Sequence, residues 1–215
     1  GALELHRSAA MAKDQSYVLG VLTTEELEHS MFPLGATASK DLIRAEAEAR
    51  GLAVAQKPDS YDICFIPEGD TREWMIEKLG GANPGDIVDQ DGTKLGEHEG
   101  SFGYTVGQRK GLHLGRPAAD GKPRYVLEIR PKTNQVVVGP HDALSISELA
   151  GQRFTWCGTA PANPSEWFEC GVQVRAHGEE VPARAAVVDG ELVIQLEEPV
   201  LGVAPGQTAV LYVGS

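Results

Sequence analysis

The sequence has few cysteines and no long apolar run. Its 215 residues include three cysteines, Cys64, Cys157 and Cys170, which lie far apart in the chain. Three separated cysteines do not make a disulfide framework, so the composition favours a reducing compartment, the cytoplasm. No apolar run approaches the roughly 18 residues that cross a bilayer, and residues 1–16 lack the apolar centre of a signal peptide. We therefore expect a cytoplasmic protein without a membrane partner.

The chain also lacks the common motifs of metal and nucleotide sites. Its six histidines do not show the spacing of metal ligands, and it contains no CxxC pair. It has neither a P-loop nor a Rossmann glycine fingerprint. Residues 96–100, GEHEG, superficially resemble a zinc-binding helix, but glycine at both ends favours a turn. We therefore expect no metal ion.

Charge is unevenly distributed along the chain. The formal net charge of −12 argues against a nucleic-acid partner, because proteins bind phosphates through lysine and arginine. Residues 107–132 nevertheless hold seven basic side chains against only Asp120 and Glu128. The seven are Arg109, Lys110, Arg116, Lys122, Arg124, Arg130 and Lys132. A local basic segment can bind RNA or can be a solvated loop, and charge alone does not decide between the two.

The first 56 residues have helical patterns. We predict a short helix over Asp14–Leu22 and another starting at Thr23–Leu27, where a hydroxyl precedes acidic residues. Ser39 is placed to cap a helix over Lys40–Arg50, which Gly51 would end. This stretch is too short for a domain of its own and is typical of the end of an α/β domain.

The next residues mix strand and helix patterns. Leu52–Ala55 is a weak strand candidate and Ile63–Ile66 a stronger one. A helix is predicted from Asp70 or Thr71 to Leu79.

From residue 83 onward the patterns favour β-structure. Hairpins are predicted around Asp91–Gly92 and around residues 131–134. Later strands are predicted over Phe168–Arg175, Ala183–Val188, Glu191–Leu196 and Gln207–Val213. Strands at this spacing are typical of a small antiparallel barrel. We therefore expect an α/β remnant over residues 1–68, a small mixed α+β central domain over 69–130 and a C-terminal antiparallel β-barrel over 131–215.

Cys64 is the one candidate nucleophile. Polar turn residues lead up to it, and the apolar run Ile63–Ile66 carries it. A thiol at a strand edge can face a cleft, but a lone cysteine is often only a small buried side chain. Lys57 would lower the pKa of the thiol, whereas Asp59 and Asp62 would raise it. Local sequence therefore leaves both interpretations open.

Six stretches, in this order, resemble motifs of one family. They are Lys13–Tyr17 with Leu19 (KDQSY-x-L), Phe32–Gly35 (FP-[LV]-G), Asp59–Ile66 (DS-x-x-ICFI), Gly85 to Gly100 (PG…G…G-x-H-x-G), Thr105–Leu112 (T-[IL]-GQRKGL) and Pro205–Ala209 (PGQ-x-A). The chain thus resembles the tRNA-specific 2-thiouridylases, which have also been labelled tRNA methyltransferases. The match spans nearly the whole chain, and its specificity comes from the combination.

The resemblance implies a fold and a reaction. Residues 1–68 would be the C-terminal part of a PP-loop ATP-pyrophosphatase domain, which adenylates the C2 oxygen of the wobble uridine of tRNA. A persulfide received from a sulfur-relay protein would then deliver sulfur to C2, with release of AMP. Cys64 matches the persulfide-bearing cysteine, which in the family can form a disulfide with an earlier one. The implied partners are tRNA and the relay protein, and we expect a monomer.

The resemblance also implies tRNA contacts. Lys13, Asp14 and Gln15 match a segment that lines the anticodon pocket, although a helix start with surface charges would look the same. Arg175 and Ala176 align with a contact pair in the barrel, where Ala176 departs from the usual larger residue. Gln207 matches a contact near the end of the barrel. Residues 108–110 could bind phosphates or form only a braced turn.

The chain departs from the family in lacking the SGG-x-DS loop that binds ATP and the earlier cysteine. No ATP-binding residue is therefore assigned, and this chain alone is predicted to be inactive. Two other interpretations stay open. The chain could be a tRNA-binding module in which Cys64 is structural, or a thiol enzyme unrelated to RNA, which the basic segment does not support.

Overall fold

The computed structural model describes residues 3–58, 71–115 and 120–214. The chain divides into two compact units. The terminal unit contains Gly1–Asp59, Ser147–Glu198 and Gln207–Ser215, and the middle unit contains Ser60–Ile146 and Pro199–Gly206. In the described part of the chain, no helix has both the length and the apolar character needed to cross a membrane.

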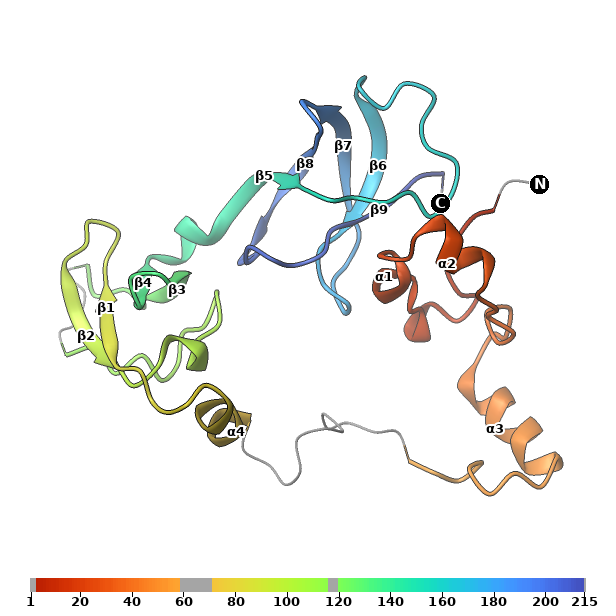
Figure 1. The fold of residues 1–215 in the computed structure, drawn as a ribbon, viewed down its shortest axis with the longest axis horizontal. Coiled ribbons are helices and arrows are strands. Elements are labelled where there is room, and N and C mark those ends of the chain that lie inside the picture. Colours follow the sequence, from red (N-terminus) through yellow and green to blue (C-terminus); the bar gives the residue numbers. More distant parts are fainter. Residues whose placement is uncertain (1–2, 59–70, 116–119, 215) are drawn as a thin grey trace. The chain divides into compact units, whose positions relative to one another are not determined.

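The middle unit is built on a four-stranded sheet in the order β2-β1-β4-β3 (Figure 1). Its elements are α4 (Thr71–Lys78), β1 (Gly85–Val88), β2 (Lys94–His98), β3 (Tyr125–Arg130) and β4 (Gln135–Gly139), with 3-10 turns at Ser101–Gly103 and His141–Leu144. Both hairpins are antiparallel, as predicted, whereas β1 and β4 pair in parallel. The prediction of a turn at residues 96–100 is wrong in part, because Gly96 and His98 lie in β2 and pair with β1.

The turn between β1 and β2 shows why the first hairpin could be predicted from the sequence. The Asp89 carboxylate accepts hydrogen bonds from the backbone N–H groups of Asp91 (3.0 Å) and Thr93 (2.7 Å). Gly92 has φ +85°, a conformation that glycine adopts without steric cost. Local side-chain chemistry therefore specifies this turn.

One apolar cluster holds the middle unit together. It contains the buried residues Ile87, Leu112, Val126, Val136 and Val138. Three consecutive residues of β4, Val136–Val138, are buried, as expected of a strand with neighbours on both sides and covered faces.

The helical elements of the terminal unit are short, and two of them begin at predicted capping residues. They are the 3-10 turn Met11–Lys13, α1 (Ser16–Leu19), α2 (Thr24–Glu28) and α3 (Lys40–Ala49). Thr23 and Glu26 form the predicted capping box, and Ser39 caps α3 by accepting from Leu42 N–H. The first helix is shorter than predicted, since α1 ends at Leu19 with Gly20 as its C-cap.

One strand prediction in this unit is wrong. A second strand prediction, outside this unit, falls on residues that the structure does not describe. Leu52–Ala55 forms turns, in which Ala55 N–H bonds the Leu52 carbonyl. The guanidinium of Arg44 donates to the Ala55 carbonyl (2.8 Å), so α3 satisfies a group that strand pairing would otherwise use. Ile63–Ile66 lies outside the described residues.

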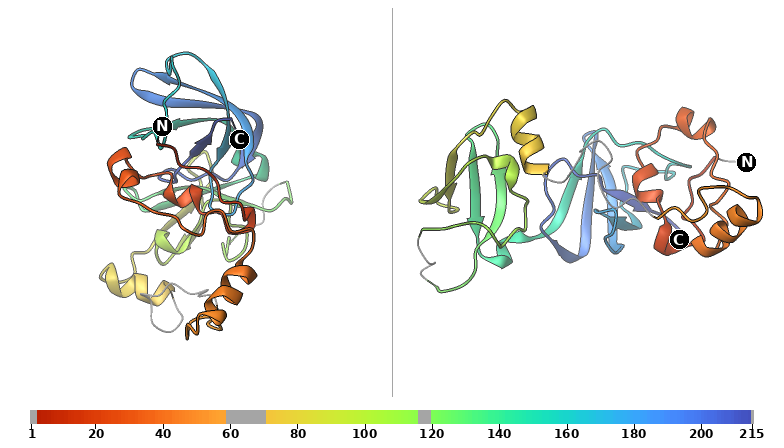
Figure 2. Two further views of the ribbon diagram at one scale, coloured as in Figure 1. Left: turned by 90° about the vertical axis from the view of Figure 1, so that its right-hand side faces the viewer. Right: turned by 90° about the horizontal axis from the view of Figure 1, so that it is seen from below.

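A five-stranded sheet, in the order β5-β8-β7-β6-β9, lies mainly in the terminal unit (Figure 1), and Figure 2 gives two further views of it. Its strands are β5 (Ser145–Gly151), β6 (Phe168–Gln173), β7 (Val181–Val188), β8 (Glu191–Leu201) and β9 (Val210–Tyr212). The pairs β6–β7, β6–β9 and β7–β8 are antiparallel, as predicted. The order of the described strands leaves β5 and β9 at opposite edges, so closure into the predicted barrel is not seen there. Strand β5 was not predicted.

The predicted boundary between the second and third domains, at residues 130 and 131, falls inside the β3–β4 hairpin. Because β3 and β4 pair from Tyr125↔Gly139 to Arg130↔Gln135, both strands belong to one sheet. We propose that the boundary lies near residue 146, where the middle unit's first segment ends. The boundary near residue 68 lies outside the described residues.

Candidate functional site

Lys13, Asp14 and Gln15 lie between the 3-10 turn and α1. Lys13 and Gln15 are exposed, whereas Asp14 is half-buried and tied to its own segment. Asp14 Oδ1 accepts from the backbone N–H of Ser8 (2.8 Å), and Oδ2 accepts from the Ser16 hydroxyl (2.5 Å). Asp14 therefore shapes the segment, and its two neighbours face solvent.

The pKa of Asp14 reflects this environment. Burial, the largest single influence, would raise the pKa of this carboxyl. Three influences act in the opposite direction: the hydrogen bonds from Ser16, the one from Ser8 and the positive charge of Arg7. Together they outweigh burial, so the pKa of Asp14 is lowered below its ordinary value of 3.8. Asp14 is thus a carboxylate at neutral pH.

The same segment packs against β9, at the other end of the sequence. The Ser16 hydroxyl and the Tyr212 hydroxyl are 2.8 Å apart, and the Tyr17 hydroxyl donates to the Thr208 carbonyl (2.8 Å). A side chain at Gly20 would place its Cβ 2.8 Å from Val210, so glycine allows this close approach. In Figure 1 the red α1 lies beside β9.

Arg175, Ala176 and Gln207 lie near that contact. The buried side-chain amide of Gln173, at the end of β6, donates to the carbonyls of Arg175 (2.8 Å) and Ala176 (3.3 Å). Gln173 pairs with Val210 across the β6–β9 ladder. Residues 175 and 176 follow this end of the ladder, and Gln207 precedes it by three residues. All three residues are exposed. The two C-terminal predictions thus flank the same end of the β6–β9 ladder, and β9 also contacts Ser16 through Tyr212.

Arg7 belongs to this contact region although no sequence pattern marks it. Its guanidinium pairs with the Glu180 carboxylate and lies over the ring of Tyr212, 3.6 Å from the ring centroid. A single arginine in a polar segment looks like a surface charge, and only the fold brings these three residues together.

Cys64, the predicted sulfur carrier, lies outside the described residues. The other two cysteines are free thiols. Cys170 is in β6, and burial, with the nearby Glu169 and Glu180, raises its pKa to about 11. Cys157 lies in a loop rather than on a barrel strand, and its Sγ contacts the carbonyls of Leu22 (3.2 Å) and Gly20 (3.4 Å). Burial also raises the pKa of Cys157, so both are poor nucleophiles at neutral pH.

In the middle unit, Gln108 and the residues around it form a braced turn. The Gln108 side chain accepts from Thr105 N–H (3.0 Å) and donates to the Lys110 carbonyl (2.9 Å). Gly107 N–H bonds the Val126 carbonyl (2.8 Å), which anchors the turn to β3. The brace is thus an amide rather than a charged side chain, and it leaves Arg109 and Lys110 exposed.

Two of the basic residues in this segment are already paired. Arg124 bonds Asp120 (3.0 Å) and Arg130 bonds Glu128 (2.8 Å). In the part of the chain that the structure describes, Arg109 and Lys110 have no carboxylate partner. Arg116 lies outside the described residues.

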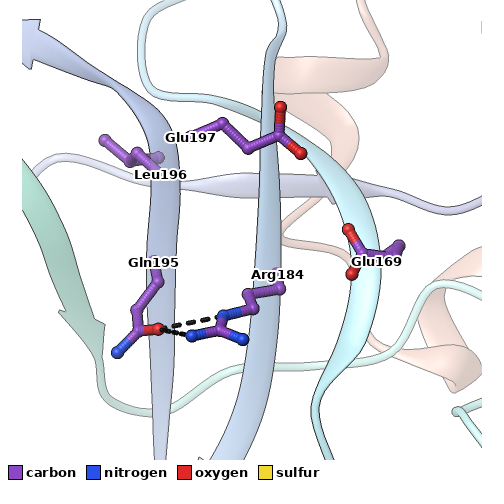
Figure 3. A pocket seen from close by; sticks show the side chains of 5 residues that line it. All are labelled: Glu169, Arg184, Gln195, Leu196 and Glu197. Carbon is purple, nitrogen blue, oxygen red and sulfur yellow. Dashed lines mark hydrogen bonds between the residues drawn. The ribbon is translucent and has the colours of Figure 1, made fainter.

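A shallow pocket of about 340 Å³ lies on the five-stranded sheet (Figure 3). Its lining residues are Glu169, Arg184, Gln195, Leu196 and Glu197. Arg184 points toward Gln195 and donates to its side-chain oxygen (2.7 and 3.0 Å). The pocket has two carboxylates and one arginine that is already hydrogen-bonded to Gln195. It is therefore a poor site for a negatively charged phosphate. Among the described residues, no three His, Cys, Asp or Glu side chains gather as metal ligands do.

Three family models match the chain in succession. Residues 1–68 match the tRNA methyl transferase HUP domain, residues 73–140 the tRNA methyl transferase PRC-barrel domain, and residues 146–215 the aminomethyltransferase beta-barrel domain. The models follow the order of the three predicted parts.

Curated relatives match the chain along its full length. The tRNA-specific 2-thiouridylase MnmA of Leifsonia xyli is 63% identical over 215 residues, and that of Clavibacter sepedonicus is 63% identical over 219. The protein of the same name from Streptomyces griseus is 58% identical over 217 residues. The alignments cover all of this chain but only 58%, 55% and 57% of those relatives. With three successive family models and these relatives in agreement, the chain belongs to the family of tRNA-specific 2-thiouridylases.

Proposed function

We propose that this chain is part of an enzyme that thiolates C2 of the wobble uridine, position 34, of tRNA. The observation that carries this proposal is the 63% identity, over the whole chain, to a protein named tRNA-specific 2-thiouridylase. The Cys64 motif lies within that alignment.

In this proposal Cys64 carries the sulfur. The terminal sulfur of its persulfide attacks C2 of a uridine whose oxygen has been adenylated. The new C–S bond forms, the C–O bond breaks, and AMP leaves with the oxygen. A second thiol then attacks the Cys64 sulfur, which frees the thiolated uridine and leaves a disulfide. Adenylation makes the oxygen a good leaving group, and the persulfide is the activated nucleophile.

The chain's residues do not fit ATP binding, because it has no SGG-x-DS loop. We therefore derive no step through ATP, and we assign adenylation and the second thiol to residues that this chain does not contain. On its own the chain is then inactive in thiolation.

The chain's second role is to bind tRNA. Lys13, Asp14 and Gln15 would contact the anticodon region together with the surface formed by Arg175, Ala176 and Gln207. Their shared attachment to β9 supports this assignment. The exposed Arg109 and Lys110 would contact backbone phosphates. A uridine extruded from the anticodon stack would reach Cys64 at a cost of a few kcal/mol. The remaining partner is a sulfur-relay protein, and we propose that the enzyme acts as a cytoplasmic monomer.

The test uses the full-length protein that contains this chain, with ATP, a persulfide donor and unmodified tRNA. Cys64→Ser is expected to abolish sulfur transfer while tRNA affinity stays within about twofold. Cys170→Ser and Cys157→Ser serve as matched controls, and both are expected to retain transfer. Equal activity of the Cys64→Ser variant would reject the sulfur-carrier role and leave the chain as a tRNA-binding module.

A further inference from the structure

Arg7 joins the beginning of the chain to the edge of the five-stranded sheet. Its guanidinium lies over the Tyr212 ring, 3.6 Å from the centroid, and pairs with the Glu180 carboxylate. The Arg7 side chain is only 18% exposed, so water screens these contacts weakly. Cation–π and ionic contacts are stronger when removed from water. We call Arg7, Glu180 and Tyr212 the Arg7 clamp.

The sheet has a gap that accommodates the clamp. Gly171 of β6 pairs directly with Tyr212 of β9. The Glu180 side chain lies over Gly171, where a Cβ would be 1.6 Å from Glu180 Oε1. Glycine at this position therefore leaves the space in which the Glu180 carboxylate reaches Arg7.

The clamp continues into the candidate tRNA-binding segment. The Tyr212 hydroxyl is 2.8 Å from the Ser16 hydroxyl, which donates to Asp14 Oδ2 at 2.5 Å. Asp14 in turn holds the N–H of Ser8, the residue after Arg7. The hydrogen bonds thus connect β9 to Asp14, the residue between the exposed Lys13 and Gln15. From Asp14 they lead back to the segment that carries Arg7.

We propose that Arg7 is a positioning residue, which fixes Lys13–Gln15 relative to Arg175, Ala176 and Gln207 so that both groups contact one tRNA. This inference rests on the proposed function. Arg7 does not itself bind phosphate, because Glu180 and Tyr212 occupy its guanidinium and its Nε is buried. Its effect on tRNA therefore passes through the placement of other residues.

The test compares variants of the full-length protein in sulfur transfer to tRNA. Arg7→Gln and Gly171→Ala are expected to raise the KM for tRNA about tenfold while kcat changes less than about twofold. Gly171→Ala leaves Arg7 intact and displaces Glu180. Arg7→Lys keeps the ion pair without the flat stacking group, so it is expected to recover part of the affinity.

Arg184→Gln is the matched control. Arg184 also lies on this sheet, over the ring of Trp167 at 5.0 Å, and bonds Gln195, but no contact of the clamp includes it. Its KM for tRNA is expected to stay unchanged. Tyr212→Phe removes one hydroxyl and keeps the stacking ring, so it tests the link to Ser16 even if Arg7→Gln fails to fold.

The outcomes separate this inference from the proposed function. If Arg7→Gln and Tyr212→Phe lower the melting temperature and leave the KM for tRNA unchanged, the clamp is only structural and the inference is overturned. If the unaltered full-length protein neither binds tRNA nor transfers sulfur, the proposed function fails, and the inference fails with it.

Discussion

The turn around Gln108 and the junction around Arg7 present exposed polar residues in opposite ways. The turn uses glycines and one amide side chain, all within Thr105–Gly111. The junction joins Ser16 to Tyr212, which are 196 residues apart. A local motif builds the first surface, whereas the second exists only when distant segments meet.

The two regions also differ in what lies behind them. The turn is anchored on an apolar cluster through Leu112 and β3. The junction is held mainly by hydroxyls, a carboxylate and an ion pair. Substitutions should therefore affect the two regions by different amounts and independently.

The largest expected effect is in the apolar cluster. Ile87 has no exposed surface, so Ile87→Ala leaves a cavity and should destabilise the middle sheet by about 2–5 kcal/mol. Amide hydrogen exchange across β1–β4 in the full-length protein measures this destabilisation. Leu79→Ala, at an exposed position, is the control and should change protection little.

Ser16→Ala tests the junction in the same way. It removes the hydroxyl between Asp14 and Tyr212, and it should lower stability by about 1–3 kcal/mol. Exchange should rise in α1 and β9 and stay unchanged in the middle sheet. Ser30→Ala, which removes only an exposed hydroxyl bonded to the nearby Glu26 carbonyl, is the comparison variant. Increased exchange in both units would mean that they are not independent.

Gly107→Ala tests the backbone of the turn. Gly107 has φ +89° and no atom near its missing Cβ, so the expected cost of about 1–2 kcal/mol is conformational strain alone. Gly103→Ala is a matched control, since its Cβ also meets open space and its φ is not positive. Equal effects of the two variants on exchange at β3 would contradict this account.

Replacing both Arg109 and Lys110 by Gln should weaken tRNA binding without unfolding the turn. The slope of log affinity against log salt should fall by roughly 0.7–0.9 for each phosphate that the variant no longer neutralises. Arg130→Gln removes a basic residue that already pairs with Glu128 and should change the slope less. An unchanged slope in the double variant would make this segment a solvated loop.

The smallest effect concerns Asp14 and pH. Its pKa is lowered in the folded protein, so its carboxylate contributes stability above the ordinary value of 3.8, and that contribution is lost as pH falls through the lower folded value. Asp14→Asn should therefore be less stable than the parent protein at pH 7, and the difference should shrink below pH 3.8. Urea unfolding of both proteins at pH 7 and at lower pH measures this difference.

Features that depend on neighbouring residues were predictable from sequence. The capping box at Thr23, the Ser39 cap and the Asp91–Gly92 turn each need only a few adjacent residues. Strand β5 was missed because SISELAG has neither an apolar run nor clear alternation, and its place in the sheet depends on β8. The parallel pairing of β1 with β4 has no local signal at all.

The candidate site was predictable only in part for the same reason. The KDQ segment and Gln207 follow from family motifs, but the contacts of Ser16 and Tyr17 with Tyr212 and Thr208 join residues more than 190 positions apart, which sequence does not give. Arg7 carries no signal in the sequence because its partners, Glu180 and Tyr212, lie more than 170 residues away.

The contact between Ser16 and Tyr212 has a consequence for protein synthesis. Ribosomes add about 5–20 residues per second, so roughly 10–40 s pass between the synthesis of Ser16 and that of Tyr212. During that time α1 has no β9 to pack against. A nascent chain interrupted before Thr208 can complete the middle sheet, yet it cannot assemble the junction. In a chain that ends before Thr208, Arg7 and Ser16 therefore both lack the tyrosine that they contact in the folded protein.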